Sequence, residues 1–294
     1  MPLKKTRPRD TVAVVGPGNV GTTLAMELRR VGVPVTEIVT RDEAASRRKG
    51  VALARQVKAK AATVSNARLD ATVVWLCVSD ANIAFVAAQL AKLPVRWKGK
   101  TVLHASGSML AAELAPLKKL GAATASFHPM NTFVPGRPNT LMATPFGAEG
   151  DPSAIAAGTR LARLVSGVTA IPVVFKIRPQ DKPLYHAMGA FSSPLIISAL
   201  NIGERIGREI GVPRSFMSHI LLKTANNFSI FGSSGAFSGP IRRGDVATIR
   251  KHLSALKRVP GAENVYRALA LNAVEHLPAK NQAELRKLLK KSKK

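Results

Sequence analysis

The first 175 residues alternate short runs of β-branched apolar residues with longer stretches in which apolar side chains recur every three or four positions. The short runs are typical of strands buried on both faces, and the longer spacing is typical of amphipathic helices. Strands are expected at Val12–Val15, Val35–Val39, Val73–Val78, Thr101–His104, Ala122–Phe127 and Ile171–Phe175. The alternation predicts βαβ units around a parallel sheet.

Two connections in this half carry clear signals. Helical spacing over Val20–Val31 is followed by Gly32, which suits the left-handed conformation that often closes a helix. The segment Val134–Gly150 contains three prolines, so an irregular path across the rim of the sheet is expected there.

After residue 181 the apolar spacing changes to the helical period and keeps it to the end of the chain. The first helix is expected to open at Pro183, to kink at Pro194 and to end at Gly211. Further helices are expected at Ser215–Phe228, Asp245–Arg258, Ala262–His276 and Ala279–Lys290, with Gly232–Gly239 as a mobile connector.

A glycine motif directly follows the first predicted strand. Gly16-Pro-Gly18-Asn19-Val20-Gly21 has G-x-G-x-x-G spacing and lies between a strand and a helix. The first glycine permits a tight turn, the second lets a pyrophosphate approach the backbone, and the third allows close packing of helix and strand. Phosphates would bind at the helix N-terminus, where free amides and the helix dipole favour anions. Within the motif, Gly16, Gly18, Asn19, Val20 and Gly21 are expected to bind a dinucleotide, and a glycine turn without a ligand is the alternative.

The motif places the predicted fold in the Rossmann class. We expect an α/β Rossmann-type parallel sheet domain over residues 1–178, followed by an all-α C-terminal domain over residues 179–294.

The end of the second predicted strand bears on the choice of cofactor. NAD-binding proteins usually present a carboxylate to the ribose diol there, whereas this chain has Thr40-Arg41-Asp42. Arg41 is suited to pair with a 2′-phosphate and Thr40 to donate a hydrogen bond, so NADP(H) is favoured over NAD(H). The alternative is that Arg41 is a solvated arginine and that Asp42 reaches the ribose.

Polar residues also follow the next three predicted strands. Ser79, His104 and His128 lie at the carboxyl ends, where ligands gather in open α/β sheets. Ser79 and His104 are expected to contact the cofactor, and His128 is a candidate for proton transfer near a nicotinamide. A hydrogen-bonded structural histidine is the alternative for both histidines.

Four runs together resemble one protein family: Val102–Gly107, Phe127–Phe133, Tyr185–Ala187 and Gly239–Asp245, the last leading to His252. The family consists of Rossmann-like proteins with a C-terminal helical domain of unknown function, described as NADP oxidoreductases. It is similar to pyrroline-5-carboxylate reductases, imine reductases and β-hydroxyacid dehydrogenases. The resemblance extends from Val12 to about His276.

In that wider group, the long first helix of the helical domain faces the nicotinamide. The resemblance therefore implies that Tyr185, His186 and Ser192 act in catalysis together with His128. Either His128 or His186 would donate the proton, and Tyr185 and Ser192 would orient the substrate. The spacing of Lys182, Tyr185 and His186 is similar to the Lys-x-x-Asn-Asn of β-hydroxyacid dehydrogenases, but Tyr and His replace both asparagines, so a catalytic lysine is not expected.

Candidate substrate-binding residues follow from the same resemblance and from the positive charge of two arginines. Ser193 lies in a Ser-Ser-Pro that resembles the Ser-Gly-Pro of pyrroline-5-carboxylate reductases, and Arg242 or Arg243 could grip an anionic substrate group. Asp245 is expected to cap a helix. Three glycines at four-residue spacing are expected to serve helix packing in a domain or dimer core: Gly203, Gly207 and Gly211.

The composition adds a strong positive charge, because 44 Lys and Arg against 17 Asp and Glu give +27. This charge brings a nucleic-acid partner into consideration. The basic residues are spread along the chain, aromatic residues make up only 5%, and no nucleic-acid-binding motif is recognised, so specific nucleic-acid binding is not expected. The basic end, Arg286–Lys294, is expected to be a docked helix with a solvated tail.

The cysteine content bears on disulfides and metal sites, and the hydropathy bears on signal peptides and membrane spans. The single cysteine, Cys77, excludes an internal disulfide framework and a multi-cysteine metal site, and no metal is expected. The basic start Lys4–Arg9 leads into an apolar run too short for a signal peptide. The longest apolar stretch, Met188–Ile202, is interrupted by polar residues and proline, so neither a membrane span nor membrane association is expected. A cytoplasmic protein is predicted.

The sequence favours an NADP(H)-dependent oxidoreductase acting on a small carbonyl, imine or hydroxy compound, which would be anionic if Arg242 or Arg243 binds it. The resemblance implies a homodimer formed through the helical domain. A non-catalytic NADP(H)-binding regulatory or scaffold protein is the alternative, because no unambiguous catalytic pair is present, and nucleic-acid binding is the less favoured third possibility.

Overall fold

The structure, a computed structural model, describes residues 10–167 and 173–290 of the chain. The chain divides into two compact units, Met1–Ala190 and Phe191–Lys294. The basic start at Lys4–Arg9 and the tail after Lys290 lie outside the described residues, as do the first two positions of the strand expected at Ile171–Phe175.

The first unit is built on an eight-stranded sheet with the order β3-β2-β1-β4-β5-β6-β7-β8. Its strands are β1 Val12–Val15, β2 Val35–Thr40, β3 Lys60–Thr63, β4 Val73–Leu76, β5 Thr101–His104, β6 Ala123–Pro129, β7 Phe146–Gly150 and β8 Val174–Lys176. All neighbouring strands are parallel except β6 and β7, which are antiparallel. The chain crosses from β3 over β1 to β4, which is the Rossmann arrangement and confirms the predicted fold class.

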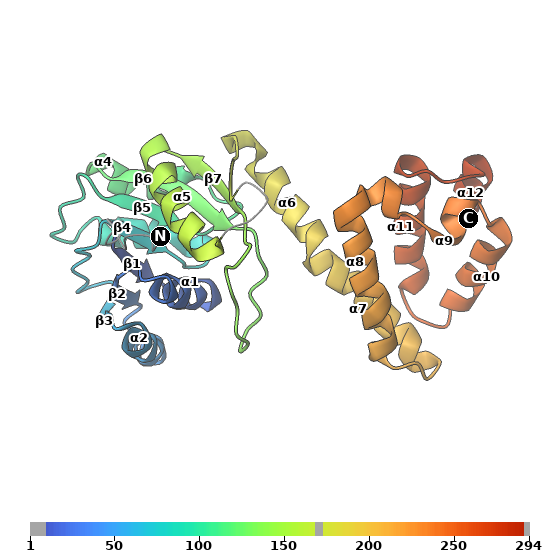
Figure 1. Cartoon of the computed structure of the whole chain (residues 1–294), viewed down its shortest axis with the longest axis horizontal. Helices are drawn as coiled ribbons and strands as arrows, with labels where there is room; N and C mark the ends of the chain where they lie inside the picture. Colours follow the sequence, from blue (N-terminus) through green and yellow to red (C-terminus); the bar gives the residue numbers. More distant parts are fainter. Residues whose placement is uncertain (1–9, 168–172, 291–294) are drawn as a thin grey trace, which may run out of the picture. The chain divides into compact units, whose positions relative to one another are not determined.

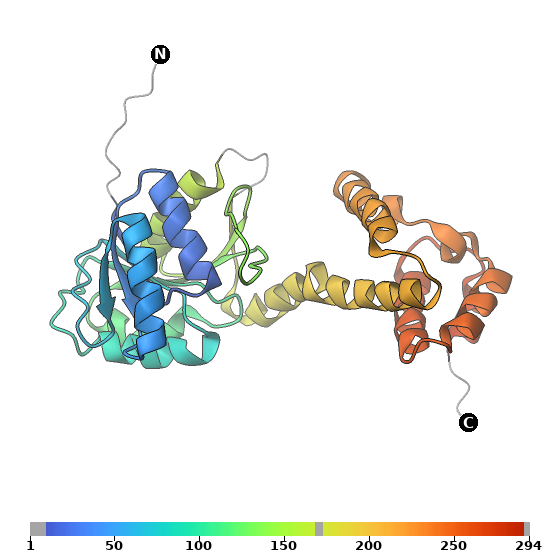
Figure 2. The same cartoon turned by 90° about the horizontal axis from the view of Figure 1, so that it is seen from below.

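Helices cover both faces of this sheet (Figures 1 and 2). They are α1 Asn19–Arg30, α2 Ala44–Val57, α3 Ile83–Leu90, α4 Ala115–Lys119 and α5 Pro152–Ser166. Successive side chains of a strand point to opposite faces, so the core divides into two layers. In β1, Val12 and Val14 pack in the layer of α1, α2 and α5, whereas Ala13 and Val15 pack in the layer of α3 and α4.

Two strands of the sheet were not predicted from the sequence. β3 is an edge strand whose first two residues, Lys60 and Ala61, are exposed, so it lacks the apolar run that marks a buried strand. β7 occupies the end of the segment expected to be irregular, and two of its five residues are glycines, which weaken a strand signal.

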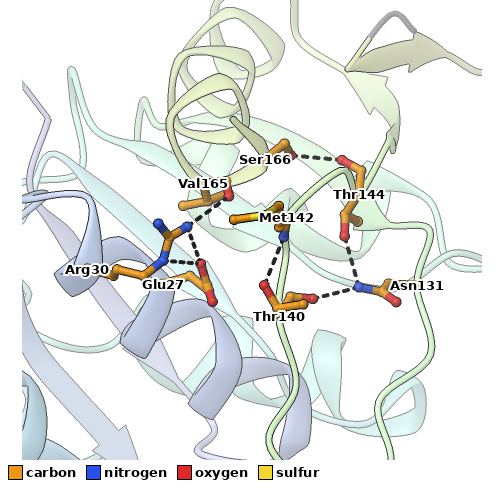
Figure 3. A network of polar contacts seen from close by, with 8 residues as sticks. All are labelled: Glu27, Arg30, Asn131, Thr140, Met142, Thr144, Val165 and Ser166. Atoms are coloured by element: carbon orange, nitrogen blue, oxygen red, sulfur yellow. Dashed lines mark hydrogen bonds and ion pairs between the residues drawn. The ribbon is translucent and has the colours of Figure 1, made fainter. Parts of the chain in front are cut away.

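The remainder of that segment is irregular, as expected, but side chains hold it in place (Figure 3). Asn131 Nδ2 donates to Thr140 O at 2.7 Å and to Thr144 Oγ1 at 2.8 Å. Ser166 at the end of α5 donates to Thr144 O at 2.8 Å, and Arg30 of α1 donates to a carbonyl of α5 at 3.4 Å. The chain directly after β6 is thereby attached to the helical layer.

The second unit consists of helices. They are α7 Pro194–Glu209, α8 Arg214–Ala236, α9 Gly239–Arg243, α10 Val246–Leu256, α11 Ala262–His276 and α12 Gln282–Leu289, while α6 Lys182–Ser192 crosses the boundary between the units. Ile249, Leu253, Val274 and Leu285 form the centre of a core between α10, α11 and α12. Among the described residues, no helix combines the length and apolar character needed to cross a membrane.

The helical predictions were correct in part. The kink expected at Pro194 is a break, because Ser193 has φ −140° and ψ −84° between α6 and α7. The mobile connector expected at Gly232–Gly239 is wrong: α8 continues to Ala236, and α9 begins at Gly239. Gly232 alone leaves the helical conformation, with φ +65°, because glycine accepts this conformation without steric cost and the helix resumes after it.

The three spaced glycines serve packing and chain reversal. A Cβ at Gly203 would lie 2.5 Å from Met217 Cε, so Gly203 allows α7 to pack against α8. A Cβ at Gly207 would lie 2.8 Å from Val212 O, and Gly211 has φ +74° in the turn between the two helices. The packing interpretation is confirmed for this pair of helices.

Candidate functional site

The glycine motif forms the turn between β1 and α1. Gly16 has φ +96°, and a Cβ there would lie 2.9 Å from Cys77 O. A Cβ at Gly21 would lie 2.1 Å from Gly16 O, so only glycine lets the helix pack this closely on the turn. A Cβ at Gly18, by contrast, meets nothing within 4 Å. The protein's own packing does not require glycine at this position, and the space beside it is open to a ligand.

A cavity of about 760 Å³ begins at this turn. Its wall follows the carboxyl ends of β1, β2 and β4 and includes Gly16, Gly18, Thr40 and Ser79. The N-terminus of α1 offers free amides and a partial positive charge beside Gly18. The residues present therefore fit a dinucleotide, with the pyrophosphate at the glycine turn and the adenosine toward the end of β2.

The end of β2 shows how the predicted 2′-phosphate residues are placed. Arg41 is exposed, and its guanidinium lies 3.3 Å from the Glu43 carboxylate. Two further residues of α2, Ser46 and Lys49, line the same part of the cavity and were not predicted from the sequence. Thr40 is buried, and its hydroxyl donates to Arg41 O at 3.0 Å. The backbone thus already engages the hydroxyl that was expected to meet a phosphate.

Asp42, the alternative ribose ligand, is held by neighbouring hydroxyls. Hydrogen bonds from Thr63 and Ser65 lower the pKa of Asp42, and Ser65 Oγ donates to its carboxylate at 3.0 Å. The carboxylate faces the same cavity as Arg41. Both the predicted arginine and its acidic alternative are therefore available at the adenosine end.

Three other residues predicted for the cofactor differ in their position. Ser79 lines the cavity and accepts a hydrogen bond from Asn82 Nδ2 at 2.7 Å. Asn19 begins α1 and is exposed. Val20 lies beside core residues, among them Leu24 and Trp75, so a contact of Val20 with the cofactor would come from its backbone amide.

His104 is completely buried at the end of β5. Its Nδ1 accepts from the Ser106 amide at 3.2 Å, so the ring proton is on Nε2 and is donated to Leu110 O at 3.0 Å. Burial lowers the pKa of His104 to about 4 and keeps the ring neutral at pH 7. Both ring nitrogens are engaged by backbone groups, which favours the structural alternative over the predicted contact with the cofactor.

A second group of polar side chains lies at the end of β6. His128 Nδ1 is 2.9 Å from Tyr185 Oη, and the two rings meet edge to face. The His186 ring lies next to His128, with centroids 6.3 Å apart. Tyr185 and His186 belong to the first turns of α6, as the spacing of these residues predicted. Three predicted catalytic residues therefore form one cluster in the first unit.

The hydrogen bonds of this cluster define the tautomer of His128. The Gly147 backbone hydrogen-bonds to the Tyr185 oxygen, so the phenol proton is free for His128 Nδ1 and the imidazole proton belongs on Nε2. Burial and then the nearby Lys182 charge lower the pKa of His128 to about 4, whereas burial raises the pKa of Tyr185 to about 12. At neutral pH the pair is uncharged, with an N–H at Nε2.

Two glycines make room for this cluster. A Cβ at Gly107 would lie 2.9 Å from His186 Cδ2 and 3.0 Å from His128 Cε1. A Cβ at Gly147 would lie 2.4 Å from Tyr185 Oη. Neither glycine was assigned to the site from the sequence. Gly107 falls within the motif after β5, so the motif contained a signal, but Gly147 lies in a strand that the sequence did not predict.

Lys182, for which no catalytic role was expected, lies in the centre of this region. Its side chain is 2% exposed. Its ammonium group donates to Ser126 Oγ and, at 3.3 Å, to Ser106 O. Burial lowers the pKa of Lys182 to about 8, and the charges of Glu149 and Asp80 oppose this effect. A buried lysine beside three predicted catalytic residues could not be recognised without the fold.

Four predicted residues belong to the second unit, and their roles stay predictions. Ser192 ends α6 and Ser193 precedes α7. Arg242 donates to Phe237 O at 2.8 Å and to a second carbonyl of the same segment, while Arg243 is exposed in the last turn of α9. The predicted helix cap is confirmed, because the Asp245 carboxylate accepts from the Thr248 amide at 3.0 Å.

In the described part of the chain, neither Cys77 nor a cluster of metal-ligating side chains adds a reactive group to the site. Burial raises the pKa of the Cys77 thiol to about 12, and the side chain packs against the core, as predicted. Within residues 10–167 and 173–290, no group of three or more His, Cys, Asp or Glu side chains is arranged to hold a metal ion.

Two family models match the chain. Residues 3–129 match a Rossmann-like domain. Residues 144–273 match the domain of unknown function DUF2520. The two matched segments correspond to a Rossmann-like sheet domain and to a region that is mostly helical. This confirms the resemblance stated from the sequence. No curated protein matches the chain.

Several solved structures share this fold. A Bacteroides fragilis protein, provisionally described as an NADP oxidoreductase, is 20% identical with a TM-score of 0.73 over 91% of this chain and 98% of that chain. The Aspergillus terreus reductive aminase in complex with NADPH and ethyl-5-oxohexanoate is 17% identical with a TM-score of 0.59 over 96% and 100%. The Plasmodium falciparum pyrroline carboxylate reductase with NADP bound is 10% identical with a TM-score of 0.56 over 97% and 100%. At these identities the similarity establishes the fold.

Proposed function

We propose that the protein is an NADP(H)-dependent oxidoreductase that acts on a small carbonyl, imine or hydroxy compound. The observation that carries the proposal is the open position beside Gly18 at the start of a cavity of about 760 Å³. A hydrogen-bonded His–Tyr pair follows β6 at the same edge of the sheet. Solved proteins with this fold that carry NADPH or NADP support the choice of cofactor.

The cluster around His128 is suited to assist such a reaction. When bound, NADPH supplies the hydride. The neutral His128 ring, oriented by Tyr185, donates a hydrogen bond from Nε2 to the oxygen or nitrogen of the substrate and polarises the bond to carbon. His186, on the exposed side of the same cluster, supplies the proton to that atom.

Turnover should depend on this cluster. Against a panel of ketones, imines and keto acids, His128→Gln, Tyr185→Phe and His186→Gln should each lower kcat for NADPH oxidation by about 100-fold or more, as expected when a group that assists proton transfer is removed. NADPH affinity, measured by calorimetry, should stay within about twofold, because none of the three residues lines the cofactor cavity.

The second unit offers a matched control. His252 Nδ1 is 3.1 Å from Tyr266 Oη, and the rings meet edge to face with centroids 5.8 Å apart. His252→Gln and Tyr266→Phe break the same kind of contact outside the cluster and should leave kcat unchanged. Tight NADPH binding without turnover on any compound would support the regulatory alternative, and unchanged kcat in the three cluster variants would refute the catalytic assignment.

We propose that the cofactor is NADP(H) and that Arg41 and Lys49 recognise its 2′-phosphate. Arg41→Ala should weaken NADPH binding by about tenfold, the effect of losing one charge-assisted hydrogen bond. NADH binding should not change, because NADH lacks that phosphate. Arg48→Ala is the control, since Arg48 is an exposed arginine of α2 that does not line the cavity. Tighter binding of NADH than of NADPH to the wild type would overturn the proposal.

We further propose that the protein is a homodimer formed through α8. Although α8 is 23 residues long, none of its residues is buried. Phe216, Ile220, Ile230 and Phe231 are between 62% and 71% exposed and follow helical spacing along one side. Apolar surface of this extent is rare on monomers. A second copy of the chain suits this surface, because isologous pairing places equivalent apolar faces against each other.

A further inference from the structure

The buried ammonium group of Lys182 has no part in the proposed reaction. Its two hydrogen-bond acceptors, Ser126 Oγ and Ser106 O, are neutral. Among the described residues, no carboxylate lies within 4 Å of it. Burying a charge without a paired counter-charge is unfavourable, so this arrangement reduces the stability of the fold. Such a cost points to a role other than stability.

The charged and titratable groups around Lys182 come from every element packed against it. They are Asp80 after β4, His104 of β5, His128 of β6, Glu149 of β7, and Tyr185 and His186 of α6. Hydrogen bonds hold both carboxylates elsewhere: Glu149 accepts from the Ala111 amide at 2.7 Å and Asp80 from Ser108 Oγ at 2.7 Å. The two carboxylates therefore compensate the positive charge of Lys182 only in part. The remaining charge acts on the neighbouring imidazoles of His104 and His128.

We propose that Lys182 is a positioning residue that holds the first turn of α6 against β6 and the chain after β5 and places its charge beside the His128 ring. Its hydrogen bonds to Ser106 and Ser126 fix the helix that carries Tyr185. Its charge makes a second positive charge on His128 unfavourable. His128 Nδ1 then stays an acceptor for the Tyr185 hydroxyl, and the single ring N–H is at Nε2. What this N–H does to a substrate rests on the proposed function, but the effect on the ring does not.

The experiment follows the His128 ring by NMR titration of the full-length protein labelled at histidine, with His128→Gln to assign the signal. In Lys182→Met the pKa of His128 should rise from about 4 by about one pH unit, because a nearby positive charge is removed. Lys182→Arg keeps the charge and should hold the value near that of the wild type. Lys119→Met, an exposed lysine on α4, is the control and should change nothing.

The wild type provides a second measurement that does not depend on a variant. Lys182 loses its proton near pH 8, so the His128 ring signal should show a second inflection near that pH. This inflection should be absent in Lys182→Arg, because arginine stays charged. An unchanged His128 titration in a folded Lys182→Met, or the absence of the inflection in the wild type, would overturn the proposal.

Activity separates this inference from the proposed function. A responsive His128 ring without turnover on any compound would refute the oxidoreductase and leave the role of Lys182 intact. Turnover with an unresponsive ring would refute the role of Lys182 alone.

Discussion

Replacing Gly18 with alanine is expected to weaken NADPH binding by at least about tenfold while the fold stays intact. A methyl group at this position meets no protein atom within 4 Å, so the free protein can accept it. The same methyl group would occupy the place where the pyrophosphate approaches the backbone amides of α1. Losing one charge-assisted hydrogen bond to a phosphate costs about 1.5–3 kcal/mol, which corresponds to about 10- to 100-fold in affinity. Calorimetric titration with NADPH measures the effect.

Gly21→Ala is the matched variant, because it adds the same methyl group three residues further along the same turn. There the Cβ would lie 2.1 Å from Gly16 O, so the turn or α1 must move. Overpacking of this kind costs about 1–3 kcal/mol and should lower the melting temperature by about 5 °C, whereas Gly18→Ala should stay within about 2 °C of the wild type. If Gly18→Ala bound NADPH as tightly as the wild type, the cavity would not be the pyrophosphate site.

Much of the sheet domain could be predicted from the sequence because its central strands are continuous apolar runs. Val12–Val15 has the bounds that its hydrophobicity indicates, and Thr101–His104 was predicted around its central Val-Leu pair. β3 was not predicted, because an edge strand is only partly buried and shows no such run. β7 was not predicted, because it is rich in glycine and follows a proline-containing segment, where local signals favour a loop.

The candidate site was predictable where chemistry follows local spacing. The glycine motif and the first turns of α6 each lie within one short segment, so the sequence alone indicates which residues are neighbours. Gly147 and Ser126 could not be found in this way, because their proximity to Tyr185 and Lys182 depends on the antiparallel pairing of β6 with β7 and on the path of α6. Tertiary contacts of this kind leave no pattern in the sequence.

Replacing Phe216 with glutamate is expected to convert a dimer to a monomer. Phe216 is 71% exposed in the single chain and lies one helical turn from Ile220 on α8. If a second copy covers this face, two buried carboxylates without partners would face the interface, and each such group costs several kcal/mol. Together these costs would cancel the association free energy of a dimer of micromolar affinity, which is about 8 kcal/mol. Light scattering after size-exclusion chromatography should give twice the chain mass for the wild type and the chain mass for the variant.

The control must be an exposed apolar residue of the other unit, so that a general effect of an added carboxylate can be recognised. Phe85 on α3 is 62% exposed, and Phe85→Glu should leave the wild-type mass unchanged. Because Phe216 touches no buried core, Phe216→Glu should also keep the melting temperature of the isolated chain, apart from the stabilisation that dimerisation itself provides. A monomeric wild type at micromolar concentration would refute the dimer, and the exposed face of α8 would then have to meet a different partner.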